Sequence, residues 1–190
     1  MDTNSVDVEL QFTPNPSTLK YVVNTEFIPS GAENYTSRAH AEDKSPLAIK
    51  LFEVKDIVGV MVAKNFVTIT LGSQERLTEL NEEVVEVLKN FVASEVPAVH
   101  PEHLGVAEKL DLSKLGDVEK QILKILDEEI RPAVAADGGD ITFHKYEDGV
   151  LFLQMKGACA GCPSSTATLK MGIENRVREV VPDLKEVLAI

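Results

Sequence analysis

The chain has 190 residues, an apolar fraction of 44% and no tryptophan, which allows one large or two small domains with largely aliphatic cores. Its formal net charge is −12, and the 31 acidic residues are spread over both halves with no dense Lys/Arg run among the 19 basic ones. A nucleic-acid backbone or an anionic membrane surface needs a basic footprint, so we exclude both as main partners. No apolar run approaches the roughly 20 residues of a membrane span.

The amino-terminal residues 1–9 are acidic and lack the features of a secretory signal or an organellar transit peptide. The chain has two cysteines, three positions apart, which is no disulfide framework for a secreted domain. We therefore expect a reducing, cytoplasmic location.

The first half reads as an α+β domain. In chain order we expect a strand at 6–12, a proline-rich turn at 13–17, a strand at 19–23, an irregular polar loop at 29–45, a short helix at 46–52, a hairpin of strands 58–62 and 66–70, and an amphipathic helix from about 74 to 93. The helix carries an apolar face and a glutamate-rich one, which we interpret as solvated.

Two prolines interrupt the pattern at Pro97 and Pro101, so we place a linker at 96–113 between domains at 1–95 and 114–190. In the second domain we expect a helix capped by Asp117, with Val118 on its apolar face, that Pro132 ends or bends. There follow a hairpin of strands 141–146 and 150–155, a helix after the cysteines with an apolar stripe ending at Val180, and a last strand within 184–190. The fold class predicted is α+β, as two small two-layer domains with helices packed on an antiparallel or mixed sheet.

Cys159 and Cys162 lie in the segment Gly-Ala-Cys-Ala-Gly-Cys-Pro and are half of a four-thiolate metal site. Either the pair is a redox dithiol, or the missing half comes from another molecule. Pro163 suits the first position of a helix, which would make Cys162 its cap. Helix N-termini favour negative charge, so we expect lowered thiol pKa values there. The glycines and alanines around the pair would let backbone approach a bulky cofactor, and Lys156 and Lys170 could add positive charge.

Several other residues have a plainer interpretation. Zinc bound with the help of His100 and His103 is disfavoured by their short spacing and their place in the linker. Asp137 and Asp140 belong to a helix-to-strand turn rather than to an acid–base pair. Met155 and Met171 are expected in the core. No phosphate-binding loop, nucleotide fingerprint or Ser/His/Asp arrangement is present, so we assign no catalytic residues and expect no enzyme.

The chain resembles the NifU-like, Nfu-type family of iron–sulfur scaffold proteins over nearly its whole length. The C-terminal resemblance is carried by Ile130–Ala133, Asp137–Asp140, Gly157–Ser165, Leu169–Glu174 and Val181–Val187, and the N-terminal one by Thr13–Lys20, Ser45–Ala48 and Leu51–Phe52. The long segment Asn24–Lys44 departs from the N-terminal pattern.

This resemblance implies a scaffold or carrier that holds a cluster through Cys159 and Cys162 of each of two subunits. The cluster would be [4Fe-4S], one per homodimer, or alternatively [2Fe-2S], received from cluster donors and passed to recipient apoproteins. The N-terminal domain would choose partners or modulate transfer. Two other classes stay open: a thiol–disulfide oxidoreductase that uses the dithiol, and a pure interaction adaptor.

Overall fold

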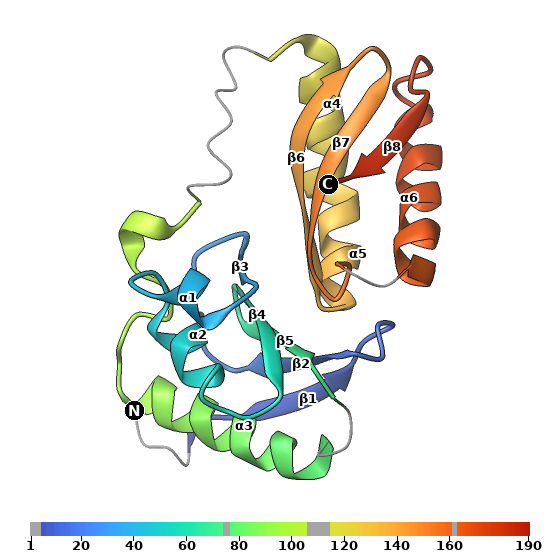
Figure 1. Cartoon of the computed structure of the whole chain (residues 1–190). Helices are drawn as coiled ribbons and strands as arrows, with labels where there is room; N and C mark the ends of the chain where they lie inside the picture. The colour runs from blue at the N-terminus through green and yellow to red at the C-terminus, as the bar shows by residue number, and fades with distance from the viewer. Residues whose placement is uncertain (1–4, 74–76, 106–114, 161–162) are drawn as a thin grey trace. The chain divides into compact units, whose positions relative to one another are not determined.

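The computed structural model describes residues 5–73, 77–105, 115–160 and 163–190 (Figure 1). The chain divides into two compact units, Met1–Val106 and Ala107–Ile190, each with its own secondary structure. Within the described ranges, no helix is long and apolar enough to cross a membrane. The fold class is α+β, as predicted.

The N-terminal unit is built on a five-stranded antiparallel sheet in the order β1-β2-β5-β4-β3. Its elements are β1 (Val8–Phe12), β2 (Thr18–Val23), β3 (Ala32–Tyr35), α1 (Arg38–Ala41), α2 (Pro46–Leu51), β4 (Ile57–Ala63), β5 (Phe66–Leu71), α3 (Leu77–Ala93) and the 3₁₀ turn η2 (Pro101–His103). The predicted hairpin is the β4–β5 pair, and the predicted helices at 46–52 and about 74–93 are α2 and α3.

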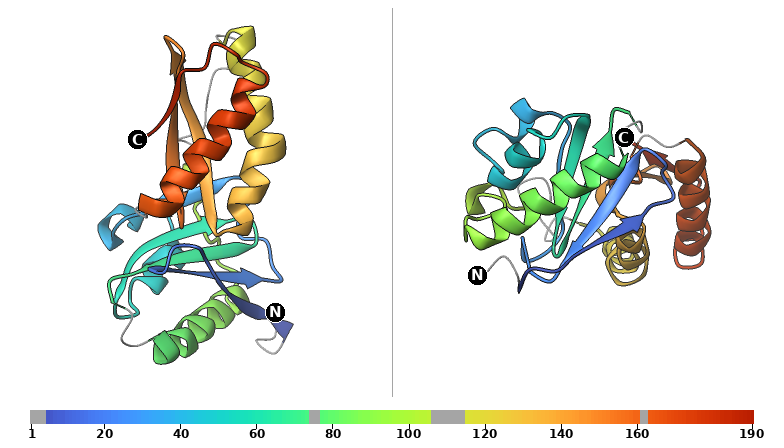
Figure 2. Two further views of the ribbon diagram at one scale, coloured as in Figure 1. Left: turned by 90° about the vertical axis from the view of Figure 1, so that its right-hand side faces the viewer. Right: turned by 90° about the horizontal axis from the view of Figure 1, so that it is seen from below.

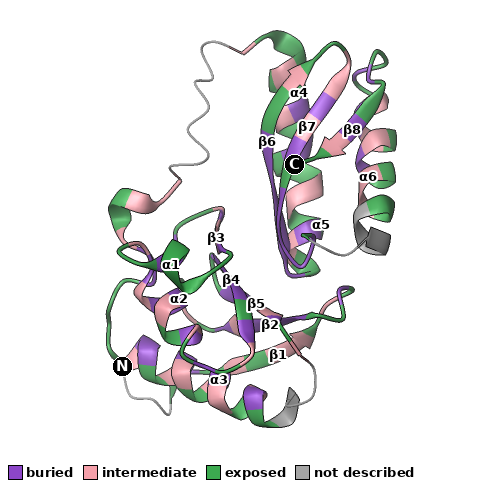
Figure 3. Ribbon diagram, in the orientation of Figure 1, coloured by how far each residue is buried: buried purple, intermediate pink, exposed green. Residues whose placement is uncertain are grey.

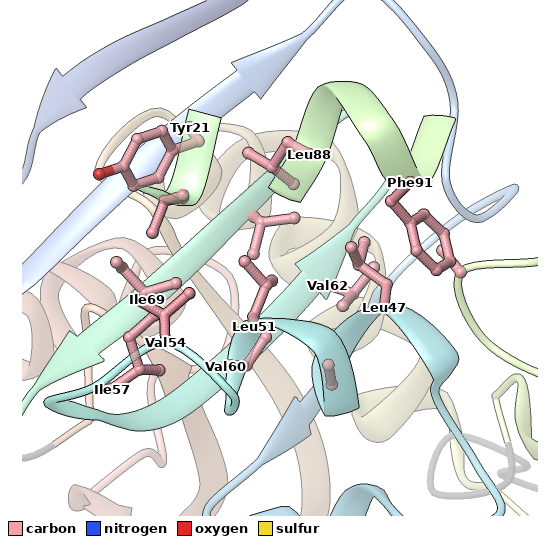
Figure 4. Close-up of a cluster of buried hydrophobic side chains, with 14 of the residues drawn as sticks. Tyr21, Leu47, Leu51, Val54, Ile57, Val60, Val62, Ile69, Leu88 and Phe91 are labelled. Atoms are coloured by element: carbon pink, nitrogen blue, oxygen red, sulfur yellow. The ribbon is translucent and has the colours of Figure 1, made fainter. Parts of the chain in front are cut away.

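One face of this sheet packs against α2 and α3 to form the core of the unit (Figure 4). Tyr21 on β2 and Val67 on β5 are register partners and therefore point to the same face of the sheet. Leu51 of α2 and Leu88 of α3 are both fully buried in the same cluster. Aliphatic side chains at strand and helix periodicity thus meet in one two-layer core, as the sequence pattern predicts.

Two expectations for this unit are wrong. The segment 29–45 is not an irregular loop, because it contains β3 and α1, and Ala32, Tyr35 and Ala41 are buried. The start of the expected linker also packs on this unit: Ala98 and Val99 are buried in its core. The polar composition of 29–45 hid the first and the prolines Pro97 and Pro101 hid the second, since both segments are held by contacts with residues far away in the sequence.

The C-terminal unit has three strands in the order β6-β7-β8, with β6 and β7 antiparallel and β8 parallel to β7. Its elements are α4 (Asp117–Ile125), the π-turn η5 (Leu126–Ile130), α5 (Arg131–Ala136), β6 (Gly139–Glu147), β7 (Val150–Gly157), α6 (Pro163–Arg178) and β8 (Glu186–Ala189). The run α4–η5–α5 lies beside α6 (Figure 2). Both helical segments contribute to one cluster with Ile141, Leu151, Leu153 and Val187 of the sheet.

The burial pattern corrects several residue assignments in this unit (Figure 3). Met155 is buried as predicted, but Met171 is 64% exposed and Val118 and Val180 are also exposed. Periodicity places a residue on a helix only to within a fraction of a turn, so residues at the margin of an apolar stripe can face solvent.

The start of the first helix also differs from the prediction. Gly116 is the N-cap, and Asp117 is the first helical residue. The Gly116 backbone N–H donates to the Glu119 carboxylate at 2.8 Å, which satisfies one amide that the helix leaves unpaired.

Pro132 neither ends nor breaks the helical run, which passes through η5 into α5. Proline has no N–H with which to bond the carbonyl four residues earlier. The run instead contains a π-turn, in which the Arg131 N–H bonds the Leu126 carbonyl five residues before it.

Candidate iron–sulfur site

Cys159 lies in the short connection between the end of β7 at Gly157 and the start of α6 at Pro163. The helix begins at Pro163, as predicted. Cys162, the second expected ligand, lies outside the described residues. The site can therefore be built from Cys159 and from the turn that leads into β6.

Cys159 packs directly against that turn. The Ala158 N–H donates to the Gly138 carbonyl at 3.1 Å, and Gly139 and Gly157 are register partners of β6 and β7. A Cβ atom at Gly139 would lie only 2.3 Å from the Cys159 Sγ, so no side chain fits there. The Asp-Gly-Gly-Asp segment is therefore a turn, as predicted, and it also forms one wall of the cysteine site.

The thiol of Cys159 is held in its protonated form in the cluster-free protein. Burial, the largest cause, together with the nearby carboxylates of Asp137 and Asp140, raises its pKa to about 11. The expectation of a lowered pKa is wrong for Cys159. This residue is buried and lies four positions before the helix, and the charged groups that shift its pKa are two carboxylates.

A group of charged side chains surrounds the same turn. Arg131 at the start of α5 donates to both carboxylate oxygens of Asp140, from Nε at 3.1 Å and from Nη2 at 3.2 Å. The Lys156 Nζ lies 4.0 Å from the same carboxylate, across the β6–β7 pair. Lys156 is thus an ion-pair partner of Asp140. The sequence reasoning missed Arg131, although it lies in one of the segments that carry the family resemblance.

The other candidates lie elsewhere. His100 and His103 belong to the N-terminal unit at η2, and Lys170 lies on α6. Among the residues that the structure describes, no three His, Cys, Asp or Glu side chains are gathered in a way that could hold a metal ion.

Two family models match the chain in tandem. The model described as "Scaffold protein Nfu/NifU N terminal" matches residues 8–95, and the NifU-like domain matches residues 122–188. The chain belongs to the NifU-like, Nfu-type family of iron–sulfur scaffold proteins. The NifU-like match contains both cysteines, so the candidate site lies in the domain that gives the family its name.

Curated relatives agree with this assignment. The chain is 35% identical over 186 residues to a Drosophila persimilis protein named "NFU1 iron-sulfur cluster scaffold homolog, mitochondrial". The aligned region covers 96% of this chain and 64% of the relative. Proteins of the same name from Drosophila willistoni and Drosophila grimshawi are 34% and 35% identical, cover 98% and 95% of this chain, and are themselves covered to 64% and 60%. The chain thus spans a little under two thirds of the length of these relatives.

Two solved structures are similar to part of the chain. A NifU-like protein from Saccharomyces cerevisiae, solved by NMR, has a TM-score of 0.46 at 17% identity and covers 50% of this chain and 86% of its own. A crystal structure of a Staphylococcus aureus protein has a TM-score of 0.38 at 14% identity and covers 43% and 98%.

The expected cytoplasmic location is contradicted by these relatives, which are named as mitochondrial proteins. A low cysteine count indicates a compartment that keeps thiols reduced, but it does not single out the cytoplasm. The cysteine content of the chain therefore does not distinguish between reducing compartments.

Proposed function

We propose that the protein is a carrier that holds one iron–sulfur cluster between two copies of itself and passes it to apoproteins. The observation that carries this proposal is a count: the full sequence has two cysteines, and both lie in one Cys-X-X-Cys segment of the NifU-like domain. An iron–sulfur cluster held by thiolates uses four. Two copies of the chain supply four.

The site residues are Cys159 and Cys162 from each subunit, related by a two-fold axis through the cluster. Such an interface is isologous, so the same two thiolates face each other across it. The stability of this dimer would depend on the cluster, because the free energy of cluster binding contributes to the free energy of dimer formation. The small side chains at Gly157, Ala158 and Ala160 leave room for this cargo.

The raised pKa of Cys159 suits a carrier better than a permanent holder. A thiol must lose its proton to become a ligand, so protons compete with iron for Cys159 at neutral pH. The free-energy cost of removing this proton makes the affinity of Cys159 for the cluster lower than that of a cysteine that is already a thiolate. A recipient whose cysteines ionise more easily can then remove the cargo.

The same property disfavours a thiol–disulfide oxidoreductase, whose attacking group must be a thiolate. Membership of a scaffold family also points to a role without turnover chemistry. We propose that the N-terminal domain selects the donors and recipients of the cluster.

Anaerobic reconstitution with iron and sulfide, followed by size-exclusion chromatography and iron counting, tests the proposal. We expect a dimer with four irons for [4Fe-4S], and loss of both iron and dimer in Cys162→Ser. Two irons per dimer would support the carrier function and indicate a [2Fe-2S] cluster as the cargo. A monomer that binds no iron but reduces disulfides would overturn the proposal in favour of an oxidoreductase.

The adaptor alternative is tested by transfer to a recipient apoprotein. Replacing both cysteines should abolish transfer of iron and sulfide while leaving each domain folded, as judged by circular dichroism. Unchanged function of the double variant would instead indicate an adaptor.

A further inference from the structure

The turn at Gly138–Gly139 is fixed from outside the cysteine segment. Asp140 follows Gly139 directly, and its carboxylate is gripped by Arg131 through two hydrogen bonds of 3.1 and 3.2 Å. A third donor of the same guanidinium, Nη1, bonds Asp127 at 3.1 Å, so Arg131 ties β6 to the helical run. A planar guanidinium that bonds a carboxylate with two donors sets direction as well as distance.

The backbone of the helical run is shaped for this contact. The π-turn η5 ends at Ile130, and Pro132 follows Arg131 directly. A π-turn shifts the following side chains around the helix relative to an uninterrupted α-helix. The Arg131 side chain reaches Asp127 within its own helical run and Asp140 on the neighbouring strand.

Gly138 and Gly139, the two residues before Asp140, contact the cysteine segment. Gly139 lies against the Cys159 Sγ, and Gly138 accepts the hydrogen bond of Ala158 at 3.1 Å. Movement of this turn would release the Ala158 N–H and open space beside the thiol. The Cys159 position therefore depends on where Asp140 is held.

We propose that Arg131 is a positioning residue of the cluster site, acting through Asp140 on the Gly138–Gly139 turn and so on Cys159. This proposal rests on the proposed carrier function, because a fixed thiol matters most where four thiolates from two chains must meet one cluster. Mutation of a residue that orients a metal ligand typically lowers the affinity for the metal about 10- to 100-fold. Arg131 makes no contact with the cluster in this role.

The decisive variant is Arg131→Lys, which keeps the positive charge and loses the two-donor grip. In the cluster-free protein we expect the Ala158 amide to exchange with solvent about tenfold faster, measured by NMR. The Val181 amide, which bonds the Val177 carbonyl at 2.8 Å, serves as an internal control and should not change. In the loaded protein we expect about tenfold faster loss of the cluster to a chelator.

Glu129→Gln is the matched control. It weakens another two-donor ion pair of the same unit, between Arg176 and Glu129 at 2.6 and 2.7 Å, which touches neither Asp140 nor the cysteine turn. We expect unchanged Ala158 exchange and cluster loss in this variant.

Ala158 exchange in Arg131→Lys within twofold of the parent would overturn the proposal. So would equal acceleration of the Ala158 and Val181 amides, which would show general destabilisation. If the parent chain binds no cluster, the carrier function fails, yet the exchange measurement on the cluster-free protein still decides whether Arg131 positions Cys159.

Discussion

At the scale of single residues, the site is governed by what lies against one thiol. Burial and the carboxylates of Asp137 and Asp140 raise the pKa of Cys159 and keep its thiol protonated at neutral pH. The backbone of Gly139 lies so close to the Cys159 sulfur that a residue with a side chain would not fit at position 139. Both features suit the proposed carrier, in which Cys159 would lose its proton only when the cluster binds.

We predict that Cys159 reacts slowly at neutral pH. With a pKa of about 11, its thiolate fraction rises about tenfold per pH unit below that value. The alkylation rate of cluster-free Cys162→Ser protein should therefore rise steadily from pH 7 to pH 10. A rate that levels off near pH 9 would show an unshifted thiol and contradict the prediction.

Gly139→Ala should displace the thiol. The added Cβ would lie 2.3 Å from the Cys159 Sγ, so we expect a loss of about 1–3 kcal/mol in the free energy of unfolding, measured with urea. Gly172→Ala in α6 is the control, since a Cβ there meets no atom within 4 Å and alanine favours the helix. Equal effects of the two substitutions would refute the tight contact.

At the scale of elements, the helices are placed by their ends as much as by their apolar faces. Ser45 shows this for α2: its hydroxyl oxygen accepts from the Ala48 N–H at 3.0 Å, and its O–H donates to the Ala98 carbonyl at 2.7 Å. One side chain thus caps the helix and holds the segment after α3 on the N-terminal unit. In the C-terminal unit, the π-turn before Pro132 performs a comparable placement for Arg131.

We predict that Ser45→Ala costs about 2 kcal/mol of stability. It removes a cap and leaves a buried carbonyl at Ala98 without that donor. Ser37→Ala is the matched control, because Ser37 caps α1 through an exposed bond to the His40 N–H at 3.1 Å and should cost about 0.5–1 kcal/mol. Urea unfolding of the whole chain compares the two, and a cost for Ser45→Ala no larger than that for Ser37→Ala would contradict the double role.

At the scale of the whole molecule, the residues that the structure describes form two hydrophobic cores with no residue in common. The N-terminal core is formed by a five-stranded sheet with two helices, and the C-terminal core by a three-stranded sheet with the helical run and α6. Because the cores are separate, we expect each unit to unfold around its own core. This division agrees with the tandem match of two family models.

Matched core substitutions should reveal two unfolding transitions. Leu51 and Leu151 are both fully buried, one in each core, so replacing either with alanine should cost about 2–5 kcal/mol. We expect Leu51→Ala to lower only the urea midpoint of the N-terminal unit and Leu151→Ala only that of the C-terminal unit, followed by NMR. A single transition that both substitutions shift equally would show that the two units unfold together.

The sequence by itself determined the cysteine count, the main helices and hairpins, and the family. These features are local, since an apolar stripe or a Cys-X-X-Cys spacing is written in neighbouring residues. It could not place β3 and α1, or predict that Met171 and Val118 are exposed, because their environment depends on packing with distant segments.

Only the tertiary structure decided the state of the cysteine site. The pKa of Cys159 is raised chiefly by burial, which no local pattern encodes, and also by Asp137 and Asp140, about twenty residues earlier in the chain. The grip of Arg131 on Asp140 joins a helix to a strand. Electrostatic and steric effects act through space, so the sequence named the candidate ligand, whereas the fold set its charge and its position.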